Sequence, residues 1–589
     1  MSADTELLRA FEPAVRFTRG EYFFPVSAER YAEHAALWLH DSSGDSELKR
    51  GAGEVSLGEL TRLGHTTQGV GCSLSGVDVG DDRARPPIIP PKDRPPRPRG
   101  SSRLASVGVV ARTIDAVNRL SLLFRGSVPG GSAARSFLLQ RDHLRPERPT
   151  YYGRVLRDGH WIVCQYWFFY AFNNWRSGFG GVNEHEGDWE QVTVFLDGSG
   201  SVDAEGPPEP RWVVFSAHDE TGDDLRRRWD DPDLSLVGSR HPVVFSGAGS
   251  HSGAYLAGDY LITVPTPTLP GVVRWLHRGA RLFTPWSTTA QGGGLAIPYV
   301  DYARGDGRAV GPGTDQEWDV VVLDDTQEWA WAYRGLWGHD TRDRLGGERG
   351  PAGPRYERDG TVRASWADPV GWSGLAKVSP NPGVERAMIA EHRERIQARL
   401  SELGVRCEED RRSLGLAAAG LAPGSPEVRA VAKREREALA RRMEHTALRD
   451  ELERLSSVEQ TPREASGPHD HLTHRRVPLT PVTGLRGRLL SGWAILSTPV
   501  ILCALALVIS PQWGFSAPWV AVVSVLALIS VEGLLRRAFL AVLLRLLLLL
   551  AVGVTIYWSV GQWHYAVAIP LVAGAIVVLA ANLREAWRH

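Results

Sequence analysis

The pattern of apolar and polar positions divides the chain into three regions, of which the C-terminal region is the clearest. From Leu489 to Val531 the chain carries no charged residue, and the main interruption is the segment PQWGFSAPW. A helix needs about 20 apolar residues to cross the roughly 30 Å hydrocarbon core of a bilayer. Two more apolar runs follow, separated by GQWH. The pattern predicts four transmembrane helices within residues 489–583, near 490–510, 517–533, 539–560 and 565–583.

Arginine residues indicate how these helices are oriented. They lie before the first span, between the second and third, and after the fourth: Arg475, Arg476, Arg486, Arg488, Arg536, Arg537, Arg584 and Arg588. The other two connections, 511–517 and 561–564, contain no arginine or lysine. Because basic segments stay on the cytoplasmic side, both termini, the tail 584–589 and the large N-terminal region should be cytoplasmic. Arginine-rich usage is typical of GC-rich genomes, and we expect a multi-pass protein of the bacterial plasma membrane.

Residues 381–460 have the pattern of a helical hairpin. Apolar residues recur every three, four or seven positions: Ile389, Ile396, Leu400, Leu403, Cys407 and Leu414, then Leu439, Met443, Leu448, Leu452 and Leu455. The segment GSPE offers Ser425 as N-cap and Pro426 as the first helical residue. We expect a coiled coil that acts as a spacer or mediates self-association. Contact with anionic lipid is the alternative, weakened by acidic residues among the arginines. A basic juxtamembrane linker, 461–488, follows.

The region before the hairpin consists of short apolar runs broken by glycine, proline and aspartate. The clearest runs are 161–173, 188–197, 211–218, 241–255 and 317–325. Strands at this spacing indicate a mainly β, sandwich-like soluble domain. Both alternate sets of the first run are apolar or aromatic, so this strand should be central and covered on both faces. We expect residues 1–81 to be the N-terminal part of the domain, 82–103 a Pro/Arg-rich surface excursion or linker, and 104–380 the main part.

Composition excludes several classes of function. The chain has 67 basic and 68 acidic residues, so no overall field attracts nucleic acid, and no nucleic-acid partner is expected. The four cysteines are far apart and form no CxxC pair, which argues against a disulfide framework and a structural zinc site. Neither a P-loop, nor a dinucleotide-binding fingerprint, nor a GxSxG nucleophile elbow occurs.

The stretch NEHEGDWEQ, residues 183–191, carries the strongest candidate chemistry. Side chains two apart in a strand share a face, so Asp188 and Glu190 should project together while Trp189 packs on the opposite face. The shared face continues with apolar side chains: Val192, Val194 and Leu196. Unpaired carboxylates would be costly there, so we expect arginine partners or a divalent cation.

His185 precedes Asp188 by three residues. The glycine between them indicates a tight turn. One imidazole nitrogen with two carboxylates can hold a divalent cation, such as Mg²⁺, Ca²⁺, Mn²⁺ or Zn²⁺. The sequence thus predicts a metal site made of His185, Asp188 and Glu190, with ordinary salt bridges as the alternative. The neighbouring Glu184 and Glu186 are expected to face solvent.

Four further polar residues are candidates for the same site. His218 and Asp219 end the run VVFSAHDE, and Ser250 and His251 lie in GAGSHSGAY, whose small residues allow close backbone approach. His251 is the best candidate for a second imidazole. The alternative is a tight corner with solvated histidines. A Ser250–His251 nucleophile pair is weaker, because adjacent residues of a strand point to opposite faces.

These motifs resemble the vacuolar protein sorting-associated protein 62 family, which carries a histidine, glycine, aspartate, tryptophan and glutamate signature and a later small-residue and histidine motif. The matching segments are HEGDWE, VVFSAHDE, GAGSHSGAY, FEPAVRFTRGEYFFPVSAERY, YRGLWG and GERGPAGP. The resemblance covers about residues 8–380, and neither the hairpin nor the membrane helices.

A more distant similarity is to the necrosis- and ethylene-inducing-like proteins, secreted β-sandwich cytolysins. Their cation site helps to recognise a glycosylated sphingolipid headgroup. By matching positions, this resemblance implies that His185, Asp188 and Glu190 face a cation. Gly187 stands where those proteins carry a second histidine, and no secretion signal is evident.

Three classes of function follow. The first is a membrane-anchored module whose cation-assisted site binds lipid headgroups, glycans or protein. The second is a metal-dependent hydrolase, in which His185, Asp188, Glu190 and His251 hold a cation that activates water. The third is a membrane scaffold or sorting protein with a purely structural motif. The membrane anchor slightly favours the first.

Overall fold

The computed structural model describes most of the chain in segments. The described residues are 2–41, 46–66, 71–76, 89–94, 108, 112, 131–144, 148–175, 184–200, 207–217, 222–264, 297–340, 350–422, 424–460, 467–472, 477–479, 484–509, 517–561 and 563–586. Most of the predicted Pro/Arg-rich excursion, 82–103, lies outside them. Its described part, 89–94, contains the short 3-10 helix η1 (Pro91–Asp93).

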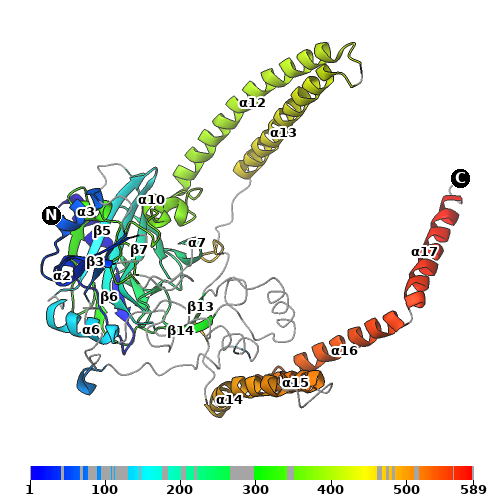
Figure 1. Ribbon diagram of the computed structural model, residues 1–589. Coiled ribbons are helices and arrows are strands. Elements are labelled where there is room, and N and C mark those ends of the chain that lie inside the picture. The colour runs from blue at the N-terminus through cyan, green and yellow to red at the C-terminus, as the bar shows by residue number, and fades with distance from the viewer. Residues whose placement is uncertain are drawn as a thin grey trace.

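A six-stranded sheet forms the centre of the N-terminal region (Figure 1). Its strands, in spatial order, are β16 (Asp319–Val322), β5 (Thr150–Asp158), β6 (Trp161–Asn173), β7 (His185–Asp197), β8 (Pro210–Phe215) and β9 (Arg226–Arg228). Strand β16 pairs with β5 in parallel, and the other neighbours are antiparallel. The two longest strands, β6 and β7, have 13 residues each and lie side by side.

Strand β6 is buried on both faces, as its sequence predicts. Tyr166, Phe168 and Tyr170 belong to one apolar core, and Trp167 and Phe169 to another on the opposite face. The alternation of side chains along a strand explains this division. Both faces of the strand thus carry aromatic and aliphatic side chains, so both faces need to be covered, as they are at the centre of the domain.

A second sheet packs against the first. Its order is β10 (Leu236–Val237), β11 (His241–Ser246), β1 (Ala14–Phe17) and β15 (Ala309–Val310), with β12 (Gly253–Ala254) paired to β11. Val15 of β1 and Val244 of β11 lie in the same apolar core as Tyr166 and Val194 of the central sheet. This core therefore joins the two sheets.

Helices and a small sheet cover the other face of the central sheet. The small sheet contains β3 (Ser46–Arg50), β2 (Ala36–His40) and β4 (Gly71–Ser75), and a separate pair contains β13 (Gly258–Val264) and β14 (Ile297–Ala303). The helical elements are α1 (Ala3–Phe11), α2 (Ala28–His34), α3 (Leu57–Thr66), α6 (Ser132–Leu139), η2 (Gln140–Leu144), α7 (Gly222–Leu225), α9 (Glu328–Ala332), α10 (Ala364–Ala367) and α11 (Pro369–Trp372). The predicted sheet-rich domain is confirmed, with mixed sheets. Helices α2, α3 and α9 pack on the far face of the central sheet, whereas Leu8 of α1 and Leu225 of α7 lie in the core between the two sheets.

Two predicted strands have different bounds in the structure. Strand β7 begins at His185, so the first half of the HEGDWE motif is strand, and the predicted tight turn there is wrong. Gly187 has φ +70°, a conformation that glycine adopts without strain, so the strand can continue through this position. The run 241–255 forms two strands, β11 and β12, which are separated by a turn around Gly249.

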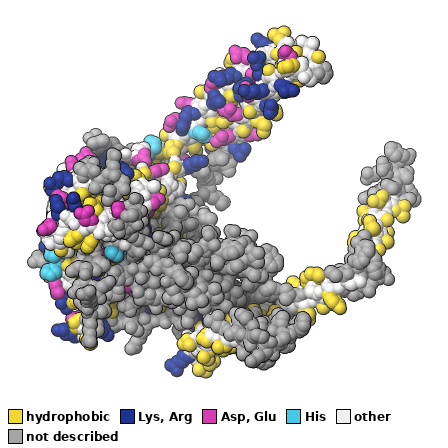
Figure 2. Space-filling model, in the orientation of Figure 1, with side chains coloured by type: hydrophobic (Ala, Val, Ile, Leu, Met, Phe, Trp, Pro, Cys, Tyr) yellow, Lys and Arg dark blue, Asp and Glu magenta, His cyan; other side chains and the backbone are white. Residues whose placement is uncertain are grey.

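The predicted hairpin is present as α12 (Pro382–Ala418) and α13 (Pro426–Gln460), which project from the domain side by side (Figure 1). Ile396 and Leu403 are buried in the hairpin. Arg441 of α13 pairs with Asp410 of α12 at 2.7 Å, and Ser425 Oγ accepts a hydrogen bond from the N–H of Val428. Figure 2 shows acidic and basic side chains interleaved along this arm.

The C-terminal region has helices at all four predicted places: α14 (Gly484–Ile509), α15 (Ala517–Leu535), α16 (Phe539–Gly561) and α17 (Trp563–Ala586). Within the part that the structure describes, one of them is long and apolar enough to cross a membrane. It is Phe539–Tyr557, with 19 residues, a mean hydropathy of 2.7 and 6% of this stretch buried. The described residues thus support one candidate span and not four; the other three stay a prediction.

Candidate functional site

Asp188 and Glu190 project from the same face of β7, as the strand alternation predicts. Both pair across to β6, where Asp188 is opposite Tyr170 and Glu190 is opposite Phe168. Trp189 belongs to the core on the opposite face. Two carboxylates therefore stand at one end of an apolar surface, and their partners decide what this site can do.

His251 is the partner of Asp188. Its Nδ1 lies 2.8 Å from Asp188 Oδ2, and Asn173 Nδ2 donates to the same oxygen at 3.1 Å. The imidazole stacks on the ring of Tyr170, with 3.8 Å between centroids and 3° between planes. His251 reaches this position from the turn after β11 with φ +57°, and Gly249 in the same turn has φ +79°. In the structure His251 therefore contacts Asp188 of the HEGDWE motif.

Glu21 completes the network and was missed in the sequence. Its Oε1 lies 3.6 Å from His251 Nε2, and its Oε2 accepts the N–H of Gly249 at 2.7 Å. Oε1 also accepts the N–H groups of Tyr22 and Phe23. The feature of the sequence that could have identified Glu21 is its position in TRGEYFFP, where it is a single carboxylate between a basic turn and an aromatic run. The imidazole is therefore enclosed between two carboxylates.

The charges of this network follow from its geometry. Burial by itself would lower the pKa of His251, but hydrogen bonding and charge from Asp188 and Glu21 raise that pKa to about 9. Burial would raise the pKa of Asp188, but His251 holds the net pKa of this carboxyl below its ordinary value. At neutral pH His251 is therefore protonated and Asp188 is ionised, so these two residues form a buried ion pair.

The pKa of Glu190 is shifted in the opposite direction from that of Asp188. Burial, and then the charge of Asp188, raise the pKa of Glu190 well above its ordinary value. Ser216 Oγ donates a hydrogen bond to Glu190 Oε2 at 2.7 Å and accepts one from the N–H of Gln191. A protonated Glu190 removes the repulsion that two adjacent carboxylates would have. A cation between them would remove the same repulsion.

A very small cavity lies between Glu190 and His251. Its wall also includes Tyr170, Ser246 and Gly253, and it offers about 10 Å³ for the centre of a water-sized molecule. This is about the space that a single water needs. The described residues thus leave room here for a water or an ion.

The third predicted metal ligand, His185, is buried at the start of β7. Its Nδ1 lies 2.7 Å from the carbonyl oxygen of Gly187, and its charge contributes to the low pKa of Asp188. Among the described residues, the cluster whose ligand atoms all lie within 4.8 Å of one another is a different one: Asp231, Asp233 and His469. His185, Asp188 and Glu190 are neighbours, but their ligand atoms do not all lie within 4.8 Å of one another.

The expectation that Glu186 faces solvent was wrong. Its side chain is buried and accepts hydrogen bonds from Ser75 Oγ at 2.9 Å, from the N–H of Gly76 at 2.6 Å and from the N–H of His339 at 3.1 Å. Burial raises the pKa of Glu186 to about 7. Glu186 ties the central sheet to the segments on its helical face. Glu184 is half-buried.

Backbone contact explains the glycine of the motif. A Cβ on Gly187 would lie 1.6 Å from the carbonyl oxygen of Trp337, and a Cβ on Gly338 would lie 1.8 Å from the carbonyl oxygen of Glu186. Residues 186–187 and 337–338 therefore touch backbone to backbone. Gly187 is required by packing in addition to its positive φ.

Ser250 is close to His251 in the sequence but has another partner. Ser250 Oγ donates to Asp301 Oδ1 at 2.8 Å, and Ser252 Oγ donates to Asp301 Oδ2 at 2.5 Å. Asp301, on β14, is buried and was not predicted. Ser250 and His251 thus contact different carboxylates, Asp301 and Asp188. His218 and Asp219 lie outside the described residues.

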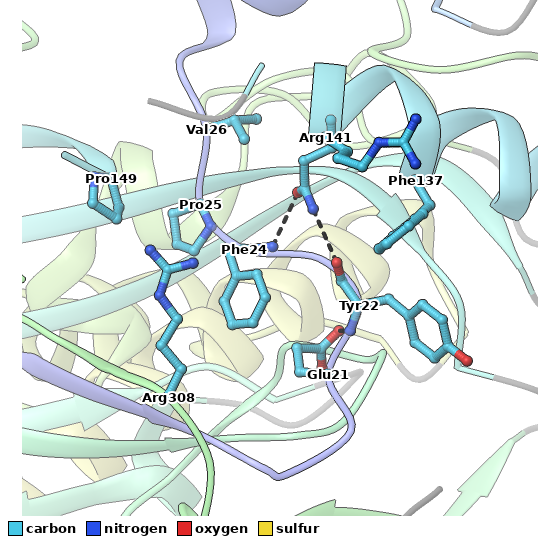
Figure 3. A pocket seen from close by; sticks show the side chains of 10 residues that line it. Glu21, Tyr22, Phe24, Pro25, Val26, Phe137, Arg141, Pro149 and Arg308 are labelled. Carbon is cyan, nitrogen blue, oxygen red and sulfur yellow. Dashed lines mark hydrogen bonds between the residues drawn. The ribbon is translucent and has the colours of Figure 1, made fainter. Parts of the chain in front are cut away.

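A larger cavity lies on the far side of Glu21. Figure 3 shows it between the segment Glu21–Val26 and Phe137, with Arg141 and Arg308 on its wall. Its volume is about 200 Å³. The side-chain amide of Gln140 accepts from the N–H of Phe24 and donates to the carbonyl of Tyr22, which fixes this wall. The cavity and the buried network therefore share one residue, Glu21.

Comparison with known proteins adds no relative. No protein-family model, no curated protein and no solved structure matches the chain. The resemblances noted in the sequence motifs therefore stay predictions.

Proposed function

We propose that this protein is a membrane-anchored binding module, whose sheet-rich, sandwich-like domain binds the polar headgroup of a lipid at the membrane surface. The observation that carries the proposal is the cavity beside Glu21. It has aromatic and apolar walls, two guanidinium groups and a volume of about 200 Å³. This lies below the roughly 300–1,000 Å³ of drug-sized sites and suits a headgroup or a sugar.

The two arginines favour an anionic ligand. Arg308 lies over the ring of Phe24, 4.6 Å from its centroid, and Arg141 contacts Asp93 and Asp142. Arg141 uses three of its five N–H donors on these two carboxylates, and Arg308 also donates through Nε to Gln316 Oε1. The other N–H groups of a guanidinium can donate to a phosphate or carboxylate. Glycans and protein segments are the other ligands that the sequence suggests.

The HEGDWE motif would support this cavity with a cation. A divalent ion at Asp188 and Glu190, with His185 nearby, would relieve the repulsion that contributes to the high pKa of Glu190. Mg²⁺, Ca²⁺, Mn²⁺ and Zn²⁺ are the candidates. The ion would change the charge around His251 and therefore the position of Glu21, which reaches the cavity wall.

Anchoring is the second part of the proposal. The stretch Phe539–Tyr557 of α16 supports association with a membrane. We propose that α14, α15 and α17 also cross the bilayer. Both termini and the sheet-rich domain would then lie on the cytoplasmic side, in keeping with the arginine distribution.

The test is calorimetric titration of the full chain, purified in a nonionic detergent, with soluble headgroups. Glycerophosphoinositol, glycerophosphoserine and a neutral methyl glycoside are each titrated with EDTA or with one divalent ion. We expect saturable binding of an anionic headgroup that weakens in Arg308→Gln and Phe24→Ala. Arg157→Gln is the matched control, because Arg157 is exposed and pairs with Asp4 away from the cavity. Absence of saturable binding to every probe would reject the proposal.

A metal-dependent hydrolase is the second candidate, and the small cavity between Glu190 and His251 favours it. A water held there would contact a carboxyl and an imidazole. His251 is protonated at neutral pH in this network and would first have to lose its proton to act as a base. Incubation with phosphoester and carboxyl-ester substrates plus each ion separates the candidates: turnover that Glu190→Gln abolishes supports the hydrolase.

A further inference from the structure

A second polar cluster lies away from the HEGDWE motif, where the juxtamembrane segment 467–472 contacts the sheet-rich domain. Arg228 Nη1 donates to the carbonyl of Gly467, and Arg226 Nη2 donates to the carbonyl of His471, each at 3.4 Å. The ring of His471 meets the ring of Trp212 edge to face, with 4.8 Å between centroids. The segment between the hairpin and the membrane helices is thus held against β8 and β9.

At this contact, three ligand-type side chains converge. His469 Nε2 lies 2.8 Å from Asp231 Oδ1 and 3.5 Å from Asp233 Oδ2. One ligand atom from each of the three residues lies within 4.8 Å of the other two. His469 is 238 positions away from Asp231 in the chain, so the cluster exists only because the segment docks there.

Asp231 supplies a second, independent indication that this cluster binds a cation. Its side chain is fully buried, and its Oδ1 accepts the N–H of Asp233 at 2.8 Å. Its Oδ2 receives no hydrogen bond: in its ion pair with Arg227 the distance from Oδ2 to Nε is 3.7 Å, which is too long for one. A buried carboxylate oxygen without a donor is costly. A bound cation would satisfy this oxygen.

The cluster has the composition and access of a metal site. It offers one imidazole nitrogen and carboxylate oxygens, the mixture that Zn²⁺ and similar divalent transition ions accept, whereas Mg²⁺ and Ca²⁺ prefer oxygen alone. The side chain of His469 is 32% exposed and that of Asp233 is 14% exposed, which gives an ion a path from solvent. Three protein ligands would leave a coordination position for water.

We propose that Asp231, Asp233 and His469 form a site for Zn²⁺ or a similar divalent transition ion, which fastens the juxtamembrane segment to the sheet-rich domain. On binding, His469 Nε2 gives up any proton it carries and donates its lone pair to the ion. The ion then cross-links the two segments at the point where His469 meets Asp231. The site is independent of the HEGDWE motif and of the proposed headgroup cavity.

The test uses the full chain in detergent, after removal of any polyhistidine tag, titrated with Co²⁺ as a spectroscopic substitute for Zn²⁺. We expect visible absorption bands that saturate with bound Co²⁺ and disappear when Zn²⁺ is added. His469→Gln and Asp233→Asn should each weaken binding about tenfold or more, as loss of a supporting or direct contact does at metal sites. These two residues are partly exposed, so their variants should fold.

Matched controls distinguish this site from its neighbours. Asp230→Asn changes an exposed carboxylate of the same turn that pairs with Arg228, and it should bind Co²⁺ like the unmodified chain. Asp188→Asn should lose any Co²⁺ that is bound at the HEGDWE motif and keep the Co²⁺ bound at Asp231, Asp233 and His469. Hydrogen exchange supplies a second readout: Zn²⁺ should slow exchange of the amides of 467–472 in the unmodified chain and not in His469→Gln. Equal Co²⁺ affinity in His469→Gln, Asp233→Asn and the unmodified chain would overturn the proposal.

Discussion

The imidazole of His251 lies parallel to the ring of Tyr170, 3.8 Å from centroid to centroid, and 2.8 Å from the carboxylate of Asp188. A protonated imidazole in this position makes a hydrogen bond, an ion pair and a cation–π contact at once. Tyr170 and Asp188 are cross-strand partners on β6 and β7. The central sheet thus holds His251 through two residues that it pairs side by side.

Removal of the Asp188 charge should destabilise the domain. Asp188→Asn leaves a buried imidazolium with one carboxylate partner, and breaking a buried pair costs about 3–5 kcal/mol. We expect a decrease of the free energy of unfolding in this range, measured by denaturant unfolding followed through tryptophan fluorescence. Glu317→Gln, at an exposed pair with Arg148, should change it by less than about 1 kcal/mol. Equal effects of the two substitutions would contradict the buried network.

Stability should fall as pH rises from about 6.5 to about 9. The pKa of His251 is about 9 in the folded chain and about 6.5 when unfolded. In this window the folded state holds a proton that the unfolded state has lost, so the contribution is complete below 6.5 and disappears above 9. Unfolding midpoints measured across this range should show the decline. In His251→Gln the decline should be smaller, and an unchanged pH profile would argue against the raised pKa.

A second decline should occur at lower pH because of Glu186. Burial raises its pKa to about 7 from an ordinary value of 4.5. Its protonated form therefore favours the folded state fully below about 4.5, and this contribution disappears as pH rises through 7. Glu186→Gln should make the decline between these limits smaller, and the contributions of Glu190 and His251 should remain. The same pH series of unfolding midpoints separates the two residues.

Substitution of Gly187 tests the backbone contact. Gly187→Ala combines a left-handed conformation, which costs about 1–2 kcal/mol for other residues, with a Cβ only 1.6 Å from the carbonyl oxygen of Trp337. Overpacking adds about 1–3 kcal/mol, so we expect a total loss of about 2–5 kcal/mol. Gly159 is the control, since it has φ +56° and nothing within 4 Å of an added Cβ. Gly159→Ala should cost only the conformational part; a Gly187→Ala cost no larger than this would refute the contact.

Membrane anchoring by α16 can be tested with a single arginine. Leu548 lies within the stretch Phe539–Tyr557 and is 65% exposed. Arginine at the centre of a membrane helix costs about 2.5–3.5 kcal/mol on insertion scales, so Leu548→Arg should increase the fraction of protein that alkaline carbonate extracts from membranes. Leu416→Arg, in the exposed end of α12, should extract like the unmodified chain. If Leu548→Arg is extracted only to the same extent as the unmodified chain, α16 is not an essential anchor.

Local pattern predicted much of the domain, because strand alternation depends only on neighbouring residues. It placed Asp188 and Glu190 on one face and β6 in the core. It could not supply Glu21 or Asp301, because their partners come from segments far away in the chain. It also misjudged Glu186, whose partners, Ser75, Gly76 and His339, lie on two other segments. A carboxylate in an apolar motif signals a partner, but only the fold identifies it.

The contact of Gly187 with Trp337 also sets an order on synthesis of the chain. Strand β7 cannot reach its final packing before residue 338 has left the ribosome, and β16, which completes the central sheet, emerges shortly before. Domains close as units, N-terminal first. The hairpin of α12 and α13 is made next and delays the first apolar helix. The sheet-rich domain therefore has time to close before the candidate span Phe539–Tyr557 is made. In the proposed topology, a closed domain would stay on the side where it was made.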